Sequence, residues 1–226
     1  MQTSDTVISQ GAGAGLFFNS SGGFPSRALG HVEPEVQATL AELLKPGDVF
    51  YDIGANIGYF TLIGARLVGP TGWVVAVEPQ PEALRRLHHN VALNRFANVT
   101  MIEAAIGDEE GYSDLVVSPE GILEWAALEP SPAPTVPTIS VRVTTLDILR
   151  GDLPAPTLIK LDVEGAEDRA LLGMRETLVR DRPAVVCEVH ASLARMCALF
   201  EAENYEVVRL GASDGGDYCQ VLGRPL

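Results

Sequence analysis

Cysteine is scarce in this sequence. The 226 residues include three cysteines, Cys187, Cys197 and Cys219, and none of them has the close spacing of a zinc or redox motif. An odd, scattered set of this kind is typical of reduced thiols and not of a disulfide framework. We therefore expect a cytoplasmic protein.

Long apolar runs are absent as well. No stretch of about 18 consecutive apolar residues occurs, and the N-terminal sequence MQTSDTVISQGAGAG lacks the basic and apolar regions of a secretion signal. We expect a soluble protein that has no membrane partner and is not exported.

Basic residues are few compared with acidic ones. The chain has 16 Lys and Arg against 30 Asp and Glu, which gives a formal net charge of −14. A phosphate backbone would be repelled by such a protein unless a basic patch intervened. The densest basic cluster, Arg85, Arg86, His88 and His89, falls in a helical pattern and indicates a solvated face. Nucleic acid is therefore not an expected partner.

Apolar residues, in contrast, are plentiful. They make up 46% of the chain and the mean hydropathy is +0.15, so there is enough material for a buried core. A chain of this length commonly forms one domain around a single core. We find no internal repeat.

Strand and helix patterns alternate from residue 33 onward, which predicts an α/β fold with a mostly parallel sheet. Strands are expected at 49–53, 73–77, 99–102, 157–161, 184–190, 205–210 and 218–223, and helices at 33–45, 57–68, 81–93, 166–178 and 191–202. The last two strands are joined by GASDGGD, which is too short for a helical crossover, so they must form a hairpin. The sheet should therefore contain an antiparallel last strand.

Two segments interrupt this alternation. Residues 1–32 include GAGAGLFFNSSGGFPS, whose Gly and Ser content resists regular structure, and we expect a flexible arm that acts as a lid over something apolar. The alternative is a disordered tail whose aromatic residues merely patch the core. Residues 33–226 then form the main domain, and about 111–143, with strand-like ends around the Pro-rich EPSPAPTVPT, form an inserted excursion.

The turn after the first strand, DIGANIG, is the first candidate for a binding site. Gly54 and Gly58 permit close backbone approach, and the following helix offers unpaired N–H groups. The dinucleotide fingerprint G-x-G-x-x-G fails here, because Asn56 and Tyr59 occupy its second and third glycine positions. GAGAG at 11–15 also fails, since no helix follows it.

An acidic residue lies at the end of each of the first two strands. Asp52 is placed to accept hydrogen bonds from an amine, and Glu78 follows Gly58 by 20 residues, where it is placed to bind both hydroxyls of a ribose. An amine and a ribose without a pyrophosphate describe S-adenosylmethionine. The structural alternative is that Asp52 caps a helix and Glu78 is a solvated strand end.

Five motifs occur in one order along the chain: PGDVFYDIGANIGYFTLIGA, GWVVAVEPQPEALRRLHHNVALN, AAIGDEEG, LIKLDVEGAE and VVCEVH. Together they resemble the FkbM family of S-adenosylmethionine-dependent methyltransferases over about residues 33–210. The resemblance implies a class I methyltransferase (Rossmann-like) fold with seven strands. It also implies O-methylation of a sugar, polyketide or carboxylate group of a small molecule in secondary metabolism. The N-terminal arm matches no pattern of the family.

On this basis we expect the following residues to contact the cofactor: Glu33, Asp52, Gly54, Ala55, Asn56, Gly58, Tyr59, Glu78, Pro79, Ala105, Ile106 and Asp162.

Candidate catalytic residues are expected on the fourth and fifth strands. Lys160 and Asp162 share one face of LIKLDVEG, and Glu188 and His190 share one face of VVCEVH, so the four groups converge if the strands are neighbours. His190 is the expected general base, because His titrates near neutrality. A packing role for His190 is the alternative.

The acidic residues around His190 allow several roles. Asp162 and Glu188, with Glu164 nearby, could orient His190, pair with Lys160, or bind Mg²⁺ together with His190. Glu164 and Glu167 also suit the start of a helix, where carboxylates favour the positive end of the dipole.

Other functions stay open at this point. One is a catalytically silent cofactor-binding partner protein, and another is a protein or nucleic-acid methyltransferase on the same fold. The N6-adenine enzymes need an Asn/Asp-Pro-Pro-aromatic motif, whereas this chain has Asp162-Val163-Glu164-Gly165. The sequence identifies neither the acceptor nor the oligomeric state, and a homodimer is left open.

Overall fold

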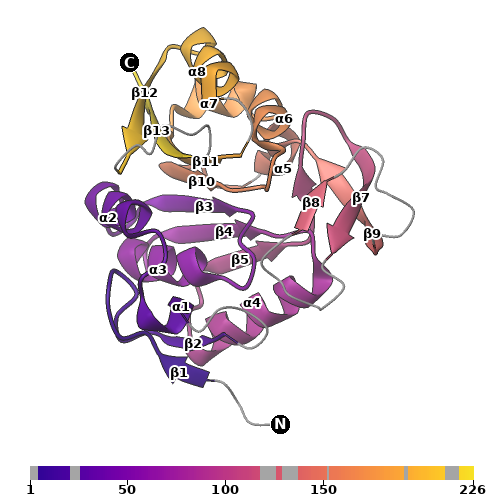
Figure 1. Ribbon diagram of the computed structural model, residues 1–226. Helices are drawn as coiled ribbons and strands as arrows, with labels where there is room; N and C mark the ends of the chain where they lie inside the picture. Colours follow the sequence, from indigo (N-terminus) through magenta and orange to yellow (C-terminus); the bar gives the residue numbers. More distant parts are fainter. Residues whose placement is uncertain are drawn as a thin grey trace.

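The computed structural model describes residues 5–20, 26–117, 126–128, 137–151, 153–190, 193–211 and 219–226. Its centre is a seven-stranded sheet in the order β12-β13-β11-β10-β3-β4-β5 (Figure 1). The strands are β3 (Val49–Ile53), β4 (Trp73–Val77), β5 (Val99–Ile102), β10 (Leu158–Leu161), β11 (Ala184–Val189), β12 (Tyr205–Leu210) and β13 (Cys219–Pro225). β13 is antiparallel to β11 and β12, and the pairs from β11 to β5 are parallel. The predicted fold class is confirmed.

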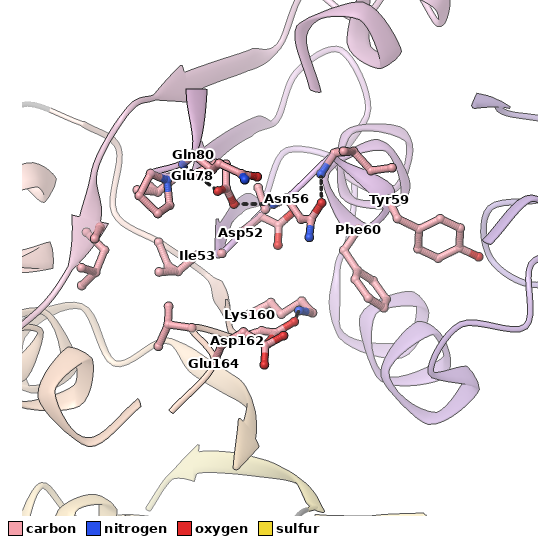
Figure 2. Close-up of a pocket in the computed structure, with 18 of the residues that line it drawn as sticks. Asp52, Ile53, Asn56, Tyr59, Phe60, Glu78, Gln80, Lys160, Asp162 and Glu164 are labelled. Atoms are coloured by element: carbon pink, nitrogen blue, oxygen red, sulfur yellow. Dashed lines mark hydrogen bonds and ion pairs between the residues drawn. The ribbon is translucent and has the colours of Figure 1, made fainter. Parts of the chain in front are cut away.

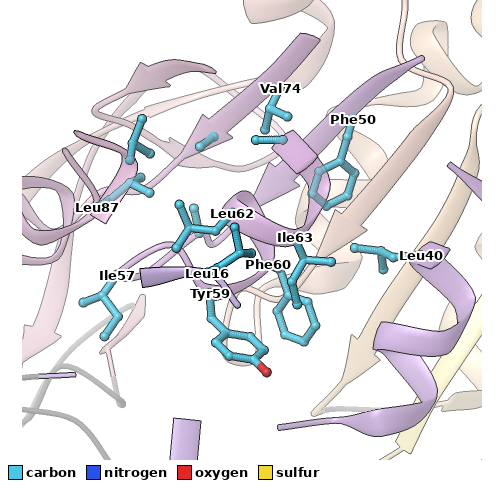
Figure 3. Close-up of a cluster of buried hydrophobic side chains, with 14 of the residues drawn as sticks. Leu16, Leu40, Phe50, Ile57, Tyr59, Phe60, Leu62, Ile63, Val74 and Leu87 are labelled. Atoms are coloured by element: carbon cyan, nitrogen blue, oxygen red, sulfur yellow. The ribbon is translucent and has the colours of Figure 1, made fainter. Parts of the chain in front are cut away.

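Helices cover both faces of this sheet (Figure 1). They are α2 (Pro34–Leu43), α3 (Tyr59–Val68) and α4 (Pro81–Leu93) on one face, and α5 (Leu146–Arg150), α6 (Glu167–Leu172), α7 (Arg175–Asp181) and α8 (Leu193–Ala202) on the other. Successive strand residues enter opposite cores: Phe50 and Val74 pack with the first group (Figure 3), and Tyr51 and Val75 with the second. Among the described residues, no helix has the length and apolar character needed to cross a bilayer.

The single helix predicted for 166–178 is wrong, because the chain forms α6 and α7 with a break at Gly173. A Cβ at Gly173 would lie 1.8 Å from the carbonyl oxygen of Gly107, so the backbones touch there. The Asp147 carboxylate then accepts hydrogen bonds from the N–H groups of Glu176 (3.0 Å) and Thr177 (2.8 Å) in the first turn of α7. This second helix start is stabilised by a residue distant in sequence.

The excursion folds into a sheet of its own. β6 (Ala105–Ile106), β9 (Thr138–Thr144), β7 (Gly111–Val117) and β8 (Ala126–Leu128) form a four-stranded sheet in that order. The strand-like ends of the excursion are confirmed as β7 and β9, and most of EPSPAPTVPT lies outside the described residues. Because β6 immediately follows β5 and pairs with β9, this sheet lies at the end of the main one (Figure 1).

The N-terminal segment has regular structure, contrary to the sequence prediction for these residues. β1 (Asp5–Val7) and β2 (Phe17–Asn19) form an antiparallel pair, which we call the N-terminal hairpin (residues 5–19). Three side chains of this segment, Ile8, Leu16 and Phe18, are buried in the core under α3 and α4. Long-range packing therefore overrides the Gly-rich local composition. Phe24 lies outside the described residues, α1 (Ser26–Leu29) follows, and closure of the segment as a lid stays a prediction.

Candidate functional site

A pocket lies at the carboxyl ends of β3, β4 and β10 (Figure 2). The chain runs from β3 to β4 and β5 on one side, and β10 pairs with the other side of β3, so this is the point where the strand order reverses. Ligands of open α/β sheets bind in this position. The lining residues are Val32, Glu33, Asp52, Ile53, Gly54, Ala55, Asn56, Ile57, Tyr59, Phe60, Val77, Glu78, Pro79, Gln80, Ala104, Ala105, Ile106, Leu115, Lys160, Asp162, Val163 and Glu164.

The residues predicted to contact the cofactor line this pocket, with the exception of Gly58. Gly58 lies at the start of α3 and faces Leu87 of α4 instead. Sequence reasoning missed Phe60, Gln80 and Leu115. Leu115 comes from β7 of the small sheet, and no sequence signal connects that strand with the turn after β3.

The turn after β3 fits closely against the end of β10. Gly54 has φ 80°, and a Cβ at this position would lie 1.7 Å from the carbonyl oxygen of Asp162. Any larger residue would separate the two strands at the pocket. Asn56, at φ 49°, continues the turn, and its side-chain oxygen accepts a hydrogen bond from the N–H of Ile57 (2.7 Å).

Glu78 at the end of β4 is buried, so the solvated-strand-end alternative is wrong. One carboxylate oxygen accepts the N–H of Asn56 (2.8 Å) and the other accepts the N–H of Gln80 (2.9 Å). Burial raises the pKa of Glu78 to about 7, although these two hydrogen bonds favour the charged form. Each oxygen keeps a lone pair that can accept a hydrogen bond from a ligand hydroxyl.

Asp52 is buried beneath the same turn. Its Oδ2 accepts a hydrogen bond from the side-chain hydroxyl of Thr61, in the first turn of α3, and the N-cap position of α3 is Gly58. Its Oδ1 has no hydrogen-bond partner among the described residues, and the same holds for Oδ1 of Asp162. Burial raises the pKa of Asp52. Two acceptor atoms at the pocket without a donor fit the ammonium group of S-adenosylmethionine.

Lys160 lies between these two carboxylates. It pairs across the sheet with Asp52, and its Nζ is 2.8 Å from Oδ2 of Asp162 and 4.8 Å from the centre of the Phe60 ring. The side chain is only 3% exposed. Burial disfavours its charge, but the surrounding carboxylates, Asp162 first, raise the pKa of Lys160 above its ordinary value. Lys160 is therefore a cation and cannot accept a proton.

The predicted convergence of the fourth and fifth strands is confirmed. β10 and β11 are adjacent, and one ligand atom each from Asp162, Glu188 and His190 lies within 4.8 Å of the others. Nδ1 of His190 is 2.9 Å from Glu167 and Nε2 is 3.3 Å from Glu164. Because both ring nitrogens face carboxylates, the ring would have to break a contact to bind a metal, and magnesium stays a prediction.

The expectation that His190 titrates near neutrality is wrong. Burial lowers its pKa, but the hydrogen bond to Glu167 and the neighbouring carboxylates outweigh burial and raise the pKa of His190 to about 9. The ring is therefore an imidazolium at pH 7. It donates a hydrogen bond through Nδ1 to Glu167 and forms an ion pair with Glu164, and it cannot act as a base without first losing its proton.

Glu164 lies near His190, as the sequence predicts, but its predicted place at the start of a helix is wrong. It does not open a helix, because α6 begins at Glu167, and it lies instead in a turn with φ 51° followed by Gly165 at φ 98°. The turn is held by the N–H of Gly165, which donates to Glu167 (2.9 Å). Burial and the nearby Asp162 raise the pKa of Glu164 to about 7. A left-handed non-glycine residue at a pocket is a strained conformation of the kind found at functional sites.

Other predicted features lie away from the pocket. Arg85 and Arg86 pair with Glu82 on α4, and His89 is 3.1 Å from Asp5, so this basic cluster is a solvated helix face as predicted.

Comparison with known proteins gives matches over most of the chain. The Methyltransferase FkbM domain matches residues 52–207. The chain is 29% identical over 198 residues to 31-O-demethyl-FK506 methyltransferase FkbM of Streptomyces tacrolimicus, which covers 73% of this chain and 75% of that protein. It is 30% identical over 163 residues to hexuronic acid methyltransferase AglP of Haloferax volcanii, covering 71% of this chain and 64% of AglP.

A solved structure supports the fold. The methyltransferase FkbM of Methylobacillus flagellatus KT superposes with a TM-score of 0.57 at 16% identity, over 83% of this chain and 50% of that one. The present chain thus spans about half of that structure. The seven-stranded architecture, the pocket at the reversal point and the matching domain agree, and the chain belongs to the FkbM family of S-adenosylmethionine-dependent methyltransferases.

Proposed function

We propose that the protein transfers a methyl group from S-adenosylmethionine to a hydroxyl oxygen of a small molecule that carries no negative charge near the reacting oxygen. The names of two relatives support a small-molecule acceptor, since one acts on a demethylated FK506 and the other on a hexuronic acid. Oxygen as the acceptor atom is our inference from the first of these names and from the pocket.

The charge of the pocket wall carries this proposal. Among the described lining residues, five have a carboxylate, namely Glu33, Asp52, Glu78, Asp162 and Glu164. One has a cation, and that residue, Lys160, is already paired with Asp162. Residues 111–143, which include β7, contain four acidic residues and one basic residue, Arg142, which is exposed and lies 3.6 Å from Glu110. A carboxylate acceptor would therefore be repelled, whereas a hydroxyl can donate to these oxygens.

The same acidic residues of the pocket wall would bind S-adenosylmethionine. Asp52 and Asp162 would accept hydrogen bonds from its ammonium group through oxygens that have no partner in the described part of the chain, and Glu78 would accept hydrogen bonds from its ribose hydroxyls. When bound, S-adenosylmethionine supplies an electrophilic methyl group on its sulfonium sulfur. The protein's own task is to hold the acceptor oxygen nearby and to take its proton.

We assign Glu164 as the general base that accepts the proton of the acceptor hydroxyl. It lines the pocket beside Asp162, and within the described part of the chain the cation beside its carboxylate is the imidazolium of His190 and not a lysine or arginine. His190 and Glu167 hold the turn from behind. His190 is then a positioning residue for Glu164, which replaces the direct base role expected from the sequence.

The experiment pairs acceptors that share a skeleton and differ in one group. Purified protein and S-adenosylmethionine are incubated with alkyl hexosides and the matching hexuronides, and with polyketide alcohols and the matching carboxylic acids. The amounts of S-adenosylhomocysteine and methylated product are measured. We expect turnover on members of the alcohol series. Turnover confined to the acids would contradict the proposal, and cofactor binding without turnover across the set would favour the catalytically silent alternative.

A further inference from the structure

Asn90 of α4 connects two segments that lie far apart in the sequence. Its Nδ2 donates a hydrogen bond to the carbonyl oxygen of Ile57 (2.8 Å), in the turn that forms the pocket. Its Oδ1 accepts the N–H of Asn19 (2.7 Å), in β2 of the N-terminal hairpin. The side chain is fully buried, so these bonds are made without competition from water.

The turn is thus held from two sides. Glu78 accepts the N–H of Asn56 on the pocket side, and Asn90 donates to the carbonyl of the next residue, Ile57, from behind. Both Asn56 and Ile57 line the pocket. A movement of Asn90 would therefore shift the residues on which the cofactor rests.

A second contact joins the same strand to the pocket. Phe18 is completely buried and packs edge-on against the ring of Tyr59, with centroids 5.6 Å apart. Tyr59 packs in the same way against Phe60 (5.3 Å), and the Phe60 ring lies under Nζ of Lys160. Tyr59 and Phe60 both line the pocket, and Figure 3 shows them in one cluster with Leu16.

We propose that Asn90 is a positioning residue for the cofactor, which couples docking of the N-terminal hairpin to the shape of the turn after β3. No described residue of the hairpin lines the pocket, so the hairpin acts through Asn90 and Tyr59. Binding and docking then strengthen each other by the same factor. This inference depends on the family's cofactor and not on the acceptor, so it can fail or stand separately from the function proposed above.

The chain offers a matched control for this inference. Asn94, one helical turn later, accepts the N–H of Phe17 (2.9 Å) and donates to the Phe17 carbonyl (2.7 Å), which are equivalent hairpin contacts. Its remaining bond goes to the carbonyl of Asn90 on the same helix (2.8 Å) and not to the turn. Loss of Asn94 therefore loosens the hairpin without touching the pocket.

The first experiment measures the Kd of S-adenosylmethionine and S-adenosylhomocysteine by calorimetry for the wild type, Asn90→Ala, Asn90→Asp and Asn94→Ala. In Asn90→Ala the hydrogen bond to Ile57 is lost, so the Kd of both ligands should rise by about 10-fold or more. Asn90→Asp keeps the acceptor for the N–H of Asn19 but has no donor for the carbonyl oxygens of Ile57 and Asn19, so its affinity for both ligands should fall as in Asn90→Ala. Asn94→Ala loosens the hairpin but keeps the bond from Asn90 to Ile57, so it should weaken binding by a smaller factor than Asn90→Ala, with a similar fall in Tm. Equal affinities for all four proteins, or equal losses in both alanine variants, would overturn the proposal.

The second experiment uses the unaltered protein and does not depend on any variant folding. Hydrogen exchange of peptides covering residues 5–19 is compared with and without saturating S-adenosylhomocysteine. Coupling predicts slower exchange of the hairpin when the ligand is bound. Protection of 52–60 with no change in 5–19 would show that the hairpin is uncoupled, as expected for a lid that acts on the acceptor alone.

Discussion

The carboxylates on the two sides of the pocket, the β3–β4 side and the β10–β11 side, are contacted by different kinds of groups. On the β3–β4 side, Asp52 and Glu78 are buried without a cation from their own strands, and backbone N–H groups and one hydroxyl are their donors. On the β10–β11 side, carboxylates are matched by cations, since Lys160 contacts Asp162 and His190 contacts Glu164 and Glu167. The first half holds its carboxylates with neutral donors, whereas the second half pairs its carboxylates with cations and still offers Oδ1 of Asp162 to a ligand.

Because of this difference, the charge of the carboxylates on the β3–β4 side depends on a bound ligand, whereas that of Asp162 on the β10–β11 side does not. Burial raises the pKa of Asp52 and Glu78, and a donor-rich ligand would lower both again by hydrogen bonding to the charged forms. In the other half, burial opposes the charge of Asp162, but the neighbouring Lys160 outweighs burial, so the pKa of Asp162 is lowered without any ligand. Substitutions in the two halves should therefore affect different quantities.

The largest expected effect is on turnover. Glu164→Gln keeps the size of the side chain but cannot take a proton, so kcat should fall by ~10²–10⁴-fold while the Kd of S-adenosylmethionine changes little. Steady-state kinetics and calorimetry measure the two quantities. His190→Gln in the same assay should reduce kcat less, because it only positions Glu164. If His190→Gln is the more damaging change, the assignment of the base must be reversed.

The next effect is on stability. Lys160→Met removes the cation between Asp162 and Asp52 and leaves their charges buried without a partner, so the free energy of unfolding should fall by ~3–5 kcal/mol. The control is Arg85→Met, which breaks an exposed ion pair with Glu82 and should change the free energy of unfolding by less than ~1 kcal/mol. Urea denaturation measures both. Similar losses in the two variants would mean that burial does not distinguish these ion pairs.

A smaller effect is expected on cofactor affinity. Asp52→Asn and Glu78→Gln each replace an acceptor oxygen by a donor NH₂ group without changing shape, and each should weaken S-adenosylmethionine binding by ~1–3 kcal/mol. Glu82→Gln, on the solvated face of α4, serves as the control. Calorimetric Kd values equal to that of the wild type in both pocket variants would remove these residues from the cofactor site.

The last expected effect is a pH dependence of stability. The folded-state pKa of His190, about 9, lies above its ordinary value of 6.5, so the protonated ring stabilises the fold. This contribution is fully present below pH 6.5 and is lost as the pH rises through 9. The difference in unfolding free energy between the wild type and His190→Gln should shrink over that interval. A difference that stays constant from pH 6 to 10 would show that the ring is held in its neutral form.

Sequence patterns predicted the main sheet well, because parallel strands and their crossover helices have clear periodicities. The placement of Asp52 and Glu78 at one pocket followed from the rule that carboxyl ends of parallel strands share an edge. The approach of Asp162 to His190 followed from the period of two along adjacent strands. These features depend on local pattern and on topology alone.

The remaining features depend on contacts between distant residues. The break at Gly173 requires the backbone of Gly107, and the N-terminal hairpin is held by side chains more than 70 positions away. The pKa of His190 depends on where the turn after β10 places Glu164 and Glu167. Local composition carries no information about such partners, so a Gly-rich stretch was expected to be flexible and a histidine to titrate normally.

The small sheet gives the protein a modular design. The chain leaves the main sheet after Ile102 and returns to it at Leu158, and apart from 104–106 the described part of this span contributes a single residue, Leu115, to the pocket. Its strands pair among themselves and not with the seven-stranded sheet. Exchange of residues 111–143 for a different loop would therefore keep the turn after β3, but it would remove Leu115 from the pocket wall and Val143 from its pairing with Ala105.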